Sequence, residues 1–304
     1  WLSQHYNAPV MLFALLIGMA FHFLHEDGRC VSGIEFASKA ILRFGVALLG
    51  ARITAHQIFG LGAAPILIVV AGIVTTIGIG YLAARWLRLG VGFGVLSGGS
   101  VAICGASAAL ALASVLPRSP ESERDTILTV VTVTLLSTVA MVIYPVIAVG
   151  LGFDNNQAGV FLGATIHDVA QVVGAGYSIS TTTGDVATYV KLLRVAMLLP
   201  VVFAIAFVAS RAARGREGGA KVAFPVFLIG FAALVVANSL ALIPDLALKA
   251  ANEASRWCLV AAISALGMKT SFQKLAAVGW RPVALMIAET VWLAGLVLAA
   301  MRWG

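Results

Sequence analysis

Long apolar stretches separated by short polar segments are the feature that most constrains the fold of this 304-residue chain. Hydrophobic residues make up 61% of it and charged residues only 11%, whereas a soluble domain carries about 25% charged residues. A soluble fold of this length could not bury so much apolar surface, so the excess is expected to face lipid. The sequence therefore predicts an all-α integral membrane protein.

Polar segments such as HEDGRC, PRSPESERD and STTTGD divide the chain into candidate spans of about 20 residues. We treat residues 1–304 as a single polytopic transmembrane domain. The first residues, WLSQHYN, lack a Met, a basic stretch and a cleavage site, so we expect one more span upstream. The ten predicted spans are residues 8–24, 34–51, 60–84, 91–116, 126–150, 157–181, 186–210, 222–243, 250–267 and 281–301.

The basic loop residues divide unequally between the two sides of these spans. One side carries ten: Arg29, Arg85, Arg88, Arg211, Arg214, Arg216, Lys221, Lys269, Lys274 and Arg281. The other carries five: Arg52, Arg118, Arg124, Lys249 and Arg302. The positive-inside rule places the loop after residue 210 in the cytoplasm and both visible ends outside. Because the bases are scattered between apolar blocks, the net charge of +7 does not indicate nucleic-acid binding.

Residues 47–66 resemble residues 264–283 when one copy is shifted by 217 positions. The shift aligns Gly50 with Gly267, Arg52 with Lys269, Thr54 with Ser271, Gly62 with Gly279 and Pro65 with Pro282. The two copies lie seven spans apart, and an odd offset gives them opposite orientations. The pattern predicts an inverted-topology repeat around 34–84 and 250–301, which is typical of secondary transporters. The alternative is chance similarity between apolar helices.

Small and polar residues interrupt two apolar spans of the motif region 91–210. The first interruption lies in LSGGSVAICGASAALA (96–111) and the second in LGATIHDVAQVVGAG (162–176). We predict non-helical backbone near 99–105 and 165–168, with the two breaks facing each other. A broken helix exposes backbone N–H groups that can bind an anion. The candidate substrate-binding residues here are Gly98, Gly99, Ser100, Cys104, Gly105, Ser107, Thr165, His167, Asp168 and Gln171.

Each interruption also has a purely structural interpretation. Small residues in the first permit tight helix packing, and the polar residues of the second can form an interhelical hydrogen-bond pair. Two bases follow in VKLLRVAMLLP, and they complete the candidate site. Lys191 and Arg194 supply charge to an anion, neutralise Asp168, or snorkel to the membrane surface. We expect Glu289, within the last span, to pair with one of the bases.

Enzyme signatures are not found in the sequence. It has no HExxH motif and no GxSxG elbow. Cys30, Cys104 and Cys258 are far apart and form neither a disulfide framework nor a metal-ligand pattern. We expect no enzymatic activity, no metal and no cofactor. Lys39 and Arg43 share a helix face and are expected at the membrane surface.

GGSVAICGASAALA, GATIHDVAQVVGAG and VKLLRVAMLLP resemble three signatures of the bacterial YeiH family, whose members are labelled sulfate exporters. LRFGVALLGARIT and ALGMKTSF match it too, so the resemblance covers essentially the whole chain. It implies a multi-pass protein of the bacterial inner (cytoplasmic) membrane, similar in type to bile-acid symporters and cation–proton antiporters. It implies a small anion as substrate, sulfate or a related sulfur oxyanion.

We further hypothesise that His167 and Asp168 form a proton-linked pair beside the anion site. The expected partners are then a coupling proton or Na⁺ and a second copy of the chain in a homodimer. The alternative function is a monovalent cation/proton antiporter that uses Asp168 and His167. A third is a channel or sensory membrane protein without coupled transport.

Overall fold

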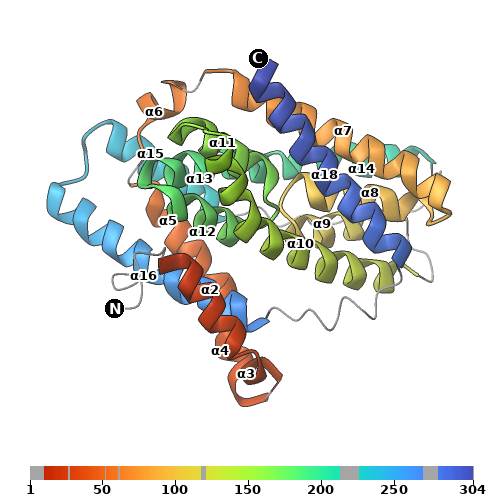
Figure 1. The fold of residues 1–304 in the computed structure, drawn as a ribbon, viewed down its shortest axis with the longest axis horizontal. Coiled ribbons are helices and arrows are strands. Elements are labelled where there is room, and N and C mark those ends of the chain that lie inside the picture. The colour runs from red at the N-terminus through yellow and green to blue at the C-terminus, as the bar shows by residue number, and fades with distance from the viewer. Residues whose placement is uncertain are drawn as a thin grey trace.

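The computed structural model describes residues 10–26, 28–51, 53–60, 62–117, 121–212, 226–269 and 280–303, and every regular element in them is a helix (Figure 1). The loop around Arg214 and the repeat positions Arg52, Ser271 and Gly279 lie outside these residues. The helices are α2 (Val10–Ala20), α3 (Phe23–Glu26), α4 (Gly28–Phe36), the π-helix η1 (Ala37–Ile41), α5 (Leu42–Leu49), α6 (Ala55–Gly60), α7 (Ala64–Leu87), α8 (Val91–Ala102), α9 (Ala106–Val115), α10 (Ser122–Gly150), α11 (Asn155–Thr165), α12 (Val169–Ile179), α13 (Thr181–Ala196), α14 (Leu198–Ala212), α15 (Val226–Ser239), α16 (Asp245–Lys269) and α18 (Trp280–Trp303).

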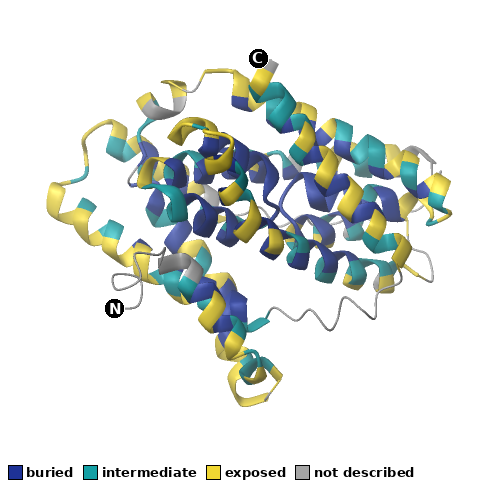
Figure 2. Ribbon diagram, in the orientation of Figure 1, coloured by how far each residue is buried: buried dark blue, intermediate teal, exposed yellow. Residues whose placement is uncertain are grey.

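Several of these helices are built to lie in a membrane. Four of the described segments are long and apolar enough to cross one: Ala64–Leu87, Arg124–Gly150, Thr181–Val208 and Trp280–Arg302. Large apolar side chains point outward from them, among them Leu82 at 65% and Val146 at 71% exposure. Buried residues instead gather in the centre of the molecule (Figure 2). An outer surface of this kind fits lipid and not water, so the predicted all-α membrane class is confirmed.

One group of helices consists of α2, α4, η1, α5, α15 and α16. Helices α2, α4, η1 and α5 pack on α16, and α15 packs on α5. Glycines allow the backbones to touch. Gly18 of α2 lies against the Ser264 carbonyl, and Gly267 of α16 lies against the Leu15 carbonyl, where a Cβ would overlap. Close approach through small residues is a common way for membrane helices to associate.

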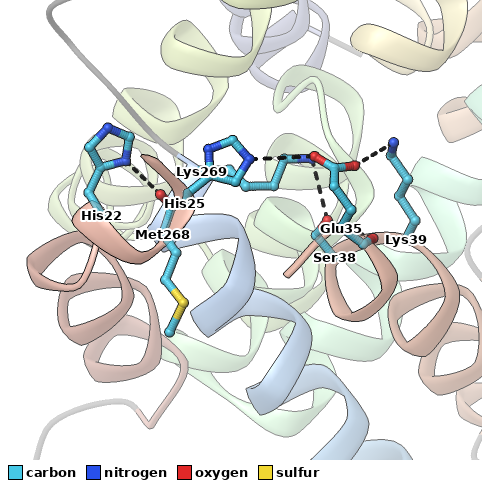
Figure 3. Close-up of polar contacts among 7 residues, drawn as sticks. All are labelled: His22, His25, Glu35, Ser38, Lys39, Met268 and Lys269. Atoms are coloured by element: carbon cyan, nitrogen blue, oxygen red, sulfur yellow. Dashed lines mark hydrogen bonds and ion pairs between the residues drawn. The ribbon is translucent and has the colours of Figure 1, made fainter. Parts of the chain in front are cut away.

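A polar cluster at one end of this group ties α4 and η1 to the last turn of α16 (Figure 3). The Glu35 carboxylate is 2.6 Å from Lys269 Nζ and 2.5 Å from Lys39 Nζ. In the neighbouring turn, His22 Nδ1 donates a hydrogen bond of 2.6 Å to the Met268 carbonyl. The side chain of Lys39 is 64% exposed, which agrees with its predicted place at a surface.

The second group comprises α7 to α14 and α18. Its closest pair is α7 with α8, where Gly80 and Gly94 each lie against the other's carbonyl. The principal contacts between the two groups are those of α12 with α2 and α16. A single helix of the second group therefore forms most of the junction.

Helices α8 and α9 form a hairpin, called here the first hairpin (residues 91–115). Gly99 of α8 lies against the side chain of Leu112 of α9, so the two arms run back along each other. Gly90, before α8, and Leu116, after α9, line the same cavity of about 950 Å³. The sequence prediction that residues 91–116 cross the membrane once is therefore wrong, because the chain reverses at the break.

Helices α11 and α12 form the second hairpin (residues 155–179). Asn155, at the start of α11, accepts hydrogen bonds from Ser180 Oγ at 2.9 Å and Thr183 Oγ1 at 3.2 Å. The start of α11 and the end of α12 thus lie at the same end of α13, and the predicted single span at 157–181 is also wrong. Helix α11 begins at a side-chain cap. The carboxylate of Asp154, the residue before the helix, accepts hydrogen bonds from the backbone N–H groups of Asn156 and Gln157.

Candidate functional site

The tips of the two hairpins meet inside the second group of helices. The first hairpin turns at Ile103–Gly105 and the second at Ile166–Asp168. Gly105 has φ +63° and ψ −127°, a conformation that side chains strongly disfavour. A Cβ on Gly105 would lie 3.5 Å from the His167 carbonyl oxygen, so the tips touch. The predicted breaks, and their facing arrangement, are confirmed.

Arg194 of α13 donates hydrogen bonds to both tips. Its Nε and Nη2 donate to the carbonyls of Ala102 and Val101, each at 2.8 Å. Its Nη1 donates to the carbonyls of Gly163 at 3.2 Å and Ile166 at 2.9 Å. These acceptors lie at the carboxyl ends of α8 and α11, where carbonyls have no partner within their own helix.

Lys191 lies one turn earlier on the same face of α13. Its Nζ donates to the carbonyls of Ile103 at 2.7 Å and Ile166 at 3.1 Å, and also to that of His167. With the bonds of Arg194 this makes seven hydrogen bonds to six carbonyls. Lys191 is 0% exposed and Arg194 is 1% exposed, so the interpretation that they snorkel to the surface is wrong.

The two cations stabilise the negative ends of α8 and α11. None of their hydrogen bonds in the described residues goes to the Asp168 carboxylate. Each cation lies at the carboxyl ends of α8 and α11, where the helix dipoles place partial negative charge. The positive ends of the returning arms, α9 and α12, begin on the far side of the same two turns.

The amino end of α9 is open. Gly105 has no side chain with which to cap it, and no side-chain cap is formed. The N–H groups of Ala106 and Ser107 therefore have no partner within the helix. Ser107 is exposed and Ala106 is partly exposed. Backbone donors, the Ser107 hydroxyl and the positive end of the dipole together form a place for an anion.

The amino end of α12 is capped by the side chain of Asp168, its N-cap residue. Asp168 accepts a hydrogen bond of 2.9 Å from the Ala170 N–H through Oδ1. Its backbone N–H donates to Ser137 Oγ of α10 at 3.0 Å. The carboxylate occupies the position that an anion would take, so the two tips are not equivalent. Asp168 caps the amino end of α12, whereas no side chain caps that of α9.

His167 is fixed between three elements. Its Nδ1 is 3.0 Å from the Val101 carbonyl of α8, and its Nε2 is 3.1 Å from Thr290 Oγ1 of α18. A carbonyl only accepts, so Nδ1 carries a hydrogen. The side chains of His167 and Asp168 thus point to different partners, although the residues are adjacent.

The remaining predicted residues lie around the tips in structural roles. Gly98 lies against the Thr76 carbonyl of α7, so the small-residue packing interpretation also holds for this part of the motif. Ser100 and Thr165 donate to carbonyls of their own helices at 2.5 and 2.6 Å. Gln171 donates to Thr138 Oγ1 of α10 at 2.8 Å, away from the tips. The predicted residues Gly99, against Leu112, and Cys104, in the first tip, are also buried.

Glu289 does not pair with a base, contrary to the expectation from the sequence. Its Oε1 accepts from Ser97 Oγ of α8 at 2.7 Å, and it forms no ion pair with any described residue. Sequence reasoning missed Ser97, Ser137 and Thr290 as partners of the candidate residues. Single hydroxyl residues in apolar spans carry no distinguishing signal, because most of them bond their own helix.

Comparison with known proteins places the chain in a family. The family model described as "Conserved hypothetical protein 698" matches residues 1–286. The UPF0324 membrane protein CT0845 of Chlorobaculum tepidum is 56% identical over 306 residues, which cover 100% of this chain and 85% of that protein. The chain belongs to the UPF0324 family of membrane proteins, as the sequence resemblance to the YeiH family indicated.

Other UPF0324 members are nearly as similar. The UPF0324 membrane protein TauZ of Paracoccus pantotrophus is 54% identical over 305 residues, covering 99% of this chain and 90% of its own length. The UPF0324 membrane protein RB0971 of Rhizobium meliloti is 52% identical over 305 residues, covering 100% and 88%. No solved structure matches this UPF0324 chain.

Proposed function

We propose that this UPF0324 protein is a secondary transporter that moves a small anion, sulfate or a related sulfur oxyanion, across the bacterial cytoplasmic membrane. The observation that carries the proposal is the open amino end of α9, with Ser107 exposed beside it. Lys191 and Arg194 donate hydrogen bonds to the same tips and bring positive charge there. A tetrahedral oxyanion needs several N–H and O–H donors and a positive potential.

Alternating access fits the division of the helices into two groups. Their principal junction is α12 against α2 and α16, while both hairpins belong to one group. Movement of that group against the other would carry an anion bound at α9 from one side of the membrane to the other. The inverted repeat that the sequence predicts around 34–84 and 250–301 agrees with this proposal, because α5 with α7 and α16 with α18 would be the corresponding pairs.

The alternative, a cation/proton antiporter that uses Asp168 and His167, is less well supported. A cation site needs a carboxylate free to bind the cation, and Asp168 already caps α12 while His167 bonds Val101 and Thr290. The positive charges of Lys191 and Arg194 nearby also disfavour a second cation. Radiolabelled sulfate uptake by proteoliposomes, compared with Na⁺-driven proton flux, separates the two functions.

A proline substitution tests the α9 site itself. Ala106 occupies the first position of α9, where proline fits a helix but removes the backbone N–H. Ala106→Pro should weaken oxyanion binding roughly 10- to 100-fold, the equivalent of a charge-assisted hydrogen bond of about 1.5–3 kcal/mol. Isothermal titration of sulfate and sulfite into purified protein measures it.

Val169→Pro is the matched control, because Val169 holds the same first position in α12, which Asp168 closes. The backbone at Asp168, with φ −103° and ψ 143°, already suits a following proline. This variant should bind oxyanions as the wild type does. Equal losses in both variants, or none in Ala106→Pro, would refute the assignment of the anion to α9.

A further inference from the structure

Glu289 of α18 is a buried carboxyl group that the proposed anion site does not use. It is 0% exposed. Its Oε1 accepts from Ser97 Oγ at 2.7 Å, whereas Oε2 is buried and has no hydrogen-bond partner among the described residues. Gly80 of α7 lies beside the carboxyl group, since a Cβ at that position would lie 2.6 Å from Oε1. Glycine thus leaves the room that the carboxyl group fills.

An ionised carboxylate in this place would have one donor and no cation. Burying such a charge unpaired costs several kcal/mol, whereas the neutral acid needs only one further acceptor for its proton. A metal cation is a poor occupant, because it needs several oxygen ligands and Ser97 is the one polar side chain bonded to Glu289 in the described part of the chain. The geometry therefore favours a proton.

Glu289 is also connected to both hairpins. Through Ser97 it contacts α8, the arm that leads to the open end of α9. The next residue, Thr290, bonds His167 at the tip of the second hairpin. Glu289 and Thr290, two consecutive residues of α18, thus contact the two hairpins whose tips form the anion site. A change of charge at Glu289 therefore acts on the elements that hold this site.

A cavity is lined by the sequence neighbours of Ser97 and Gly80. The cavity of about 950 Å³ at the base of the first hairpin is lined by Ile77 and Tyr81 of α7 and by Leu96 of α8. Leu96 precedes Ser97, and Tyr81 follows Gly80. Arg88, Glu121 and Arg124 also line this cavity. The residues that precede Ser97 and follow Gly80 in the sequence thus line a cavity that also carries charged side chains.

We propose that Glu289 carries the coupling proton of transport, bound when the anion site at α9 is occupied and released when that site is empty. The proposal rests on the proposed anion transport. A negative charge on Glu289 would oppose an anion at the tip of the adjoining hairpin, whereas the neutral acid would not. Linkage makes this reciprocal: anion binding favours protonation, and acid favours anion binding. Transport is then proton–anion symport.

The test measures sulfate affinity between about pH 5.5 and 9, a range that includes titration of a buried acid. In the wild type the affinity should fall as the pH rises, by up to about tenfold per pH unit for one linked proton. Glu289→Gln removes the titration and keeps the acceptor for Ser97, so its affinity should stay at the acidic wild-type value throughout. Glu289→Asp should restore the pH dependence. Glu253→Gln changes an exposed glutamate of α16 and should behave as the wild type.

Proton uptake gives an independent readout. When sulfate is added to weakly buffered protein, the wild type and Glu253→Gln should take up protons from the solution. Glu289→Gln should take up none. A Glu289→Gln curve parallel to that of the wild type overturns the proposal and leaves anion transport standing. Affinity that follows Na⁺ at fixed pH overturns it too. If no oxyanion binds to the wild type, the proposed function fails and this inference with it.

Discussion

Replacing Arg194 by methionine tests how the two hairpin tips are held together. The guanidinium is 1% exposed and donates four hydrogen bonds, two to carbonyls of α8 and two to carbonyls of α11. Methionine fills much of the space but donates nothing. Four hydrogen bonds to buried carbonyls are then lost. The carbonyls of Val101 and Ile166 keep His167 and Lys191 as donors, whereas those of Ala102 and Gly163 lose the one side-chain donor they have among the described residues. The negative ends of two helices also lose a charge that stabilised them.

The expected cost follows from these bonds. A hydrogen bond to a charged group contributes roughly 1.5–3 kcal/mol, and a buried acceptor left without a donor costs about 1–3 kcal/mol. The four bonds belong to one network and do not add. Local relaxation and water recover part of the loss, so Arg194→Met should lower the free energy of unfolding by about 3–5 kcal/mol, as does breaking a buried ion pair. That is a large share of the roughly 5–15 kcal/mol that stabilises a typical protein.

A graded series separates charge from geometry. Arg194→Lys keeps the positive charge, but one ammonium cannot fork between α8 and α11, so it should lose about half as much stability as Arg194→Met. Arg302→Met is the control, because Arg302 is exposed at the end of α18 and should change stability by less than about 0.5 kcal/mol. Denaturant unfolding in detergent micelles, followed by circular dichroism, measures all three. If Arg194→Met is as stable as Arg302→Met, the tips are not held by this side chain.

Two further predictions concern the first hairpin. Gly105→Ala forces a Cβ into a backbone conformation that costs about 1–3 kcal/mol, while the 3.5 Å to the His167 carbonyl leaves room for the atom itself; anion affinity should fall, and unchanged affinity would show that the tip conformation is unimportant. Cysteines introduced one at a time at Gly90 and Glu121, in a background with Cys30→Ser and Cys258→Ser that keeps only the buried Cys104, should react with an impermeant thiol reagent from the same side of the membrane, and one at Leu242 from the opposite side. Labelling of Gly90 and Glu121 from opposite sides would contradict the hairpin.

The helix breaks could be predicted from sequence because their signal is local. Glycine at φ +63° and a His–Asp dipeptide are unfavourable within a continuous apolar helix, and both mark the turns found. The direction of the chain after each break could not be predicted. A span of 25 apolar residues and two arms of 12 and 10 residues have the same hydropathy. Tertiary features distinguish them, such as the contact of Gly99 with Leu112 and the cavity that Gly90 and Leu116 share.

The structural roles of Lys191 and Arg194 could not be predicted from the sequence for the same reason. Their spacing places them on one face of a helix, which the sequence shows. Their acceptors lie about 90 residues earlier, at Val101 to Ile103, and about 25–30 residues earlier, at Gly163 to His167. No pattern within the helix records such partners. The sequence therefore indicated that these cations act at the site without indicating that they also hold it together.

The hairpins also change the charge balance used to orient the chain. A single span at 91–116 puts the loop between α9 and α10 opposite the loop that contains Arg88. A hairpin returns it to the same side, and with it Arg118 and Arg124 of the sequence. The second hairpin moves no basic residue, because the segment from 151 to 156 has none. Ten bases against five become twelve against three. The positive-inside rule then predicts that the side with Arg88 is cytoplasmic, with the first hairpin entering from the cytoplasm and the second from outside. Such opposed entry is what an inverted repeat requires, and it brings the two tips together within the protein, where irregular backbone is tolerated.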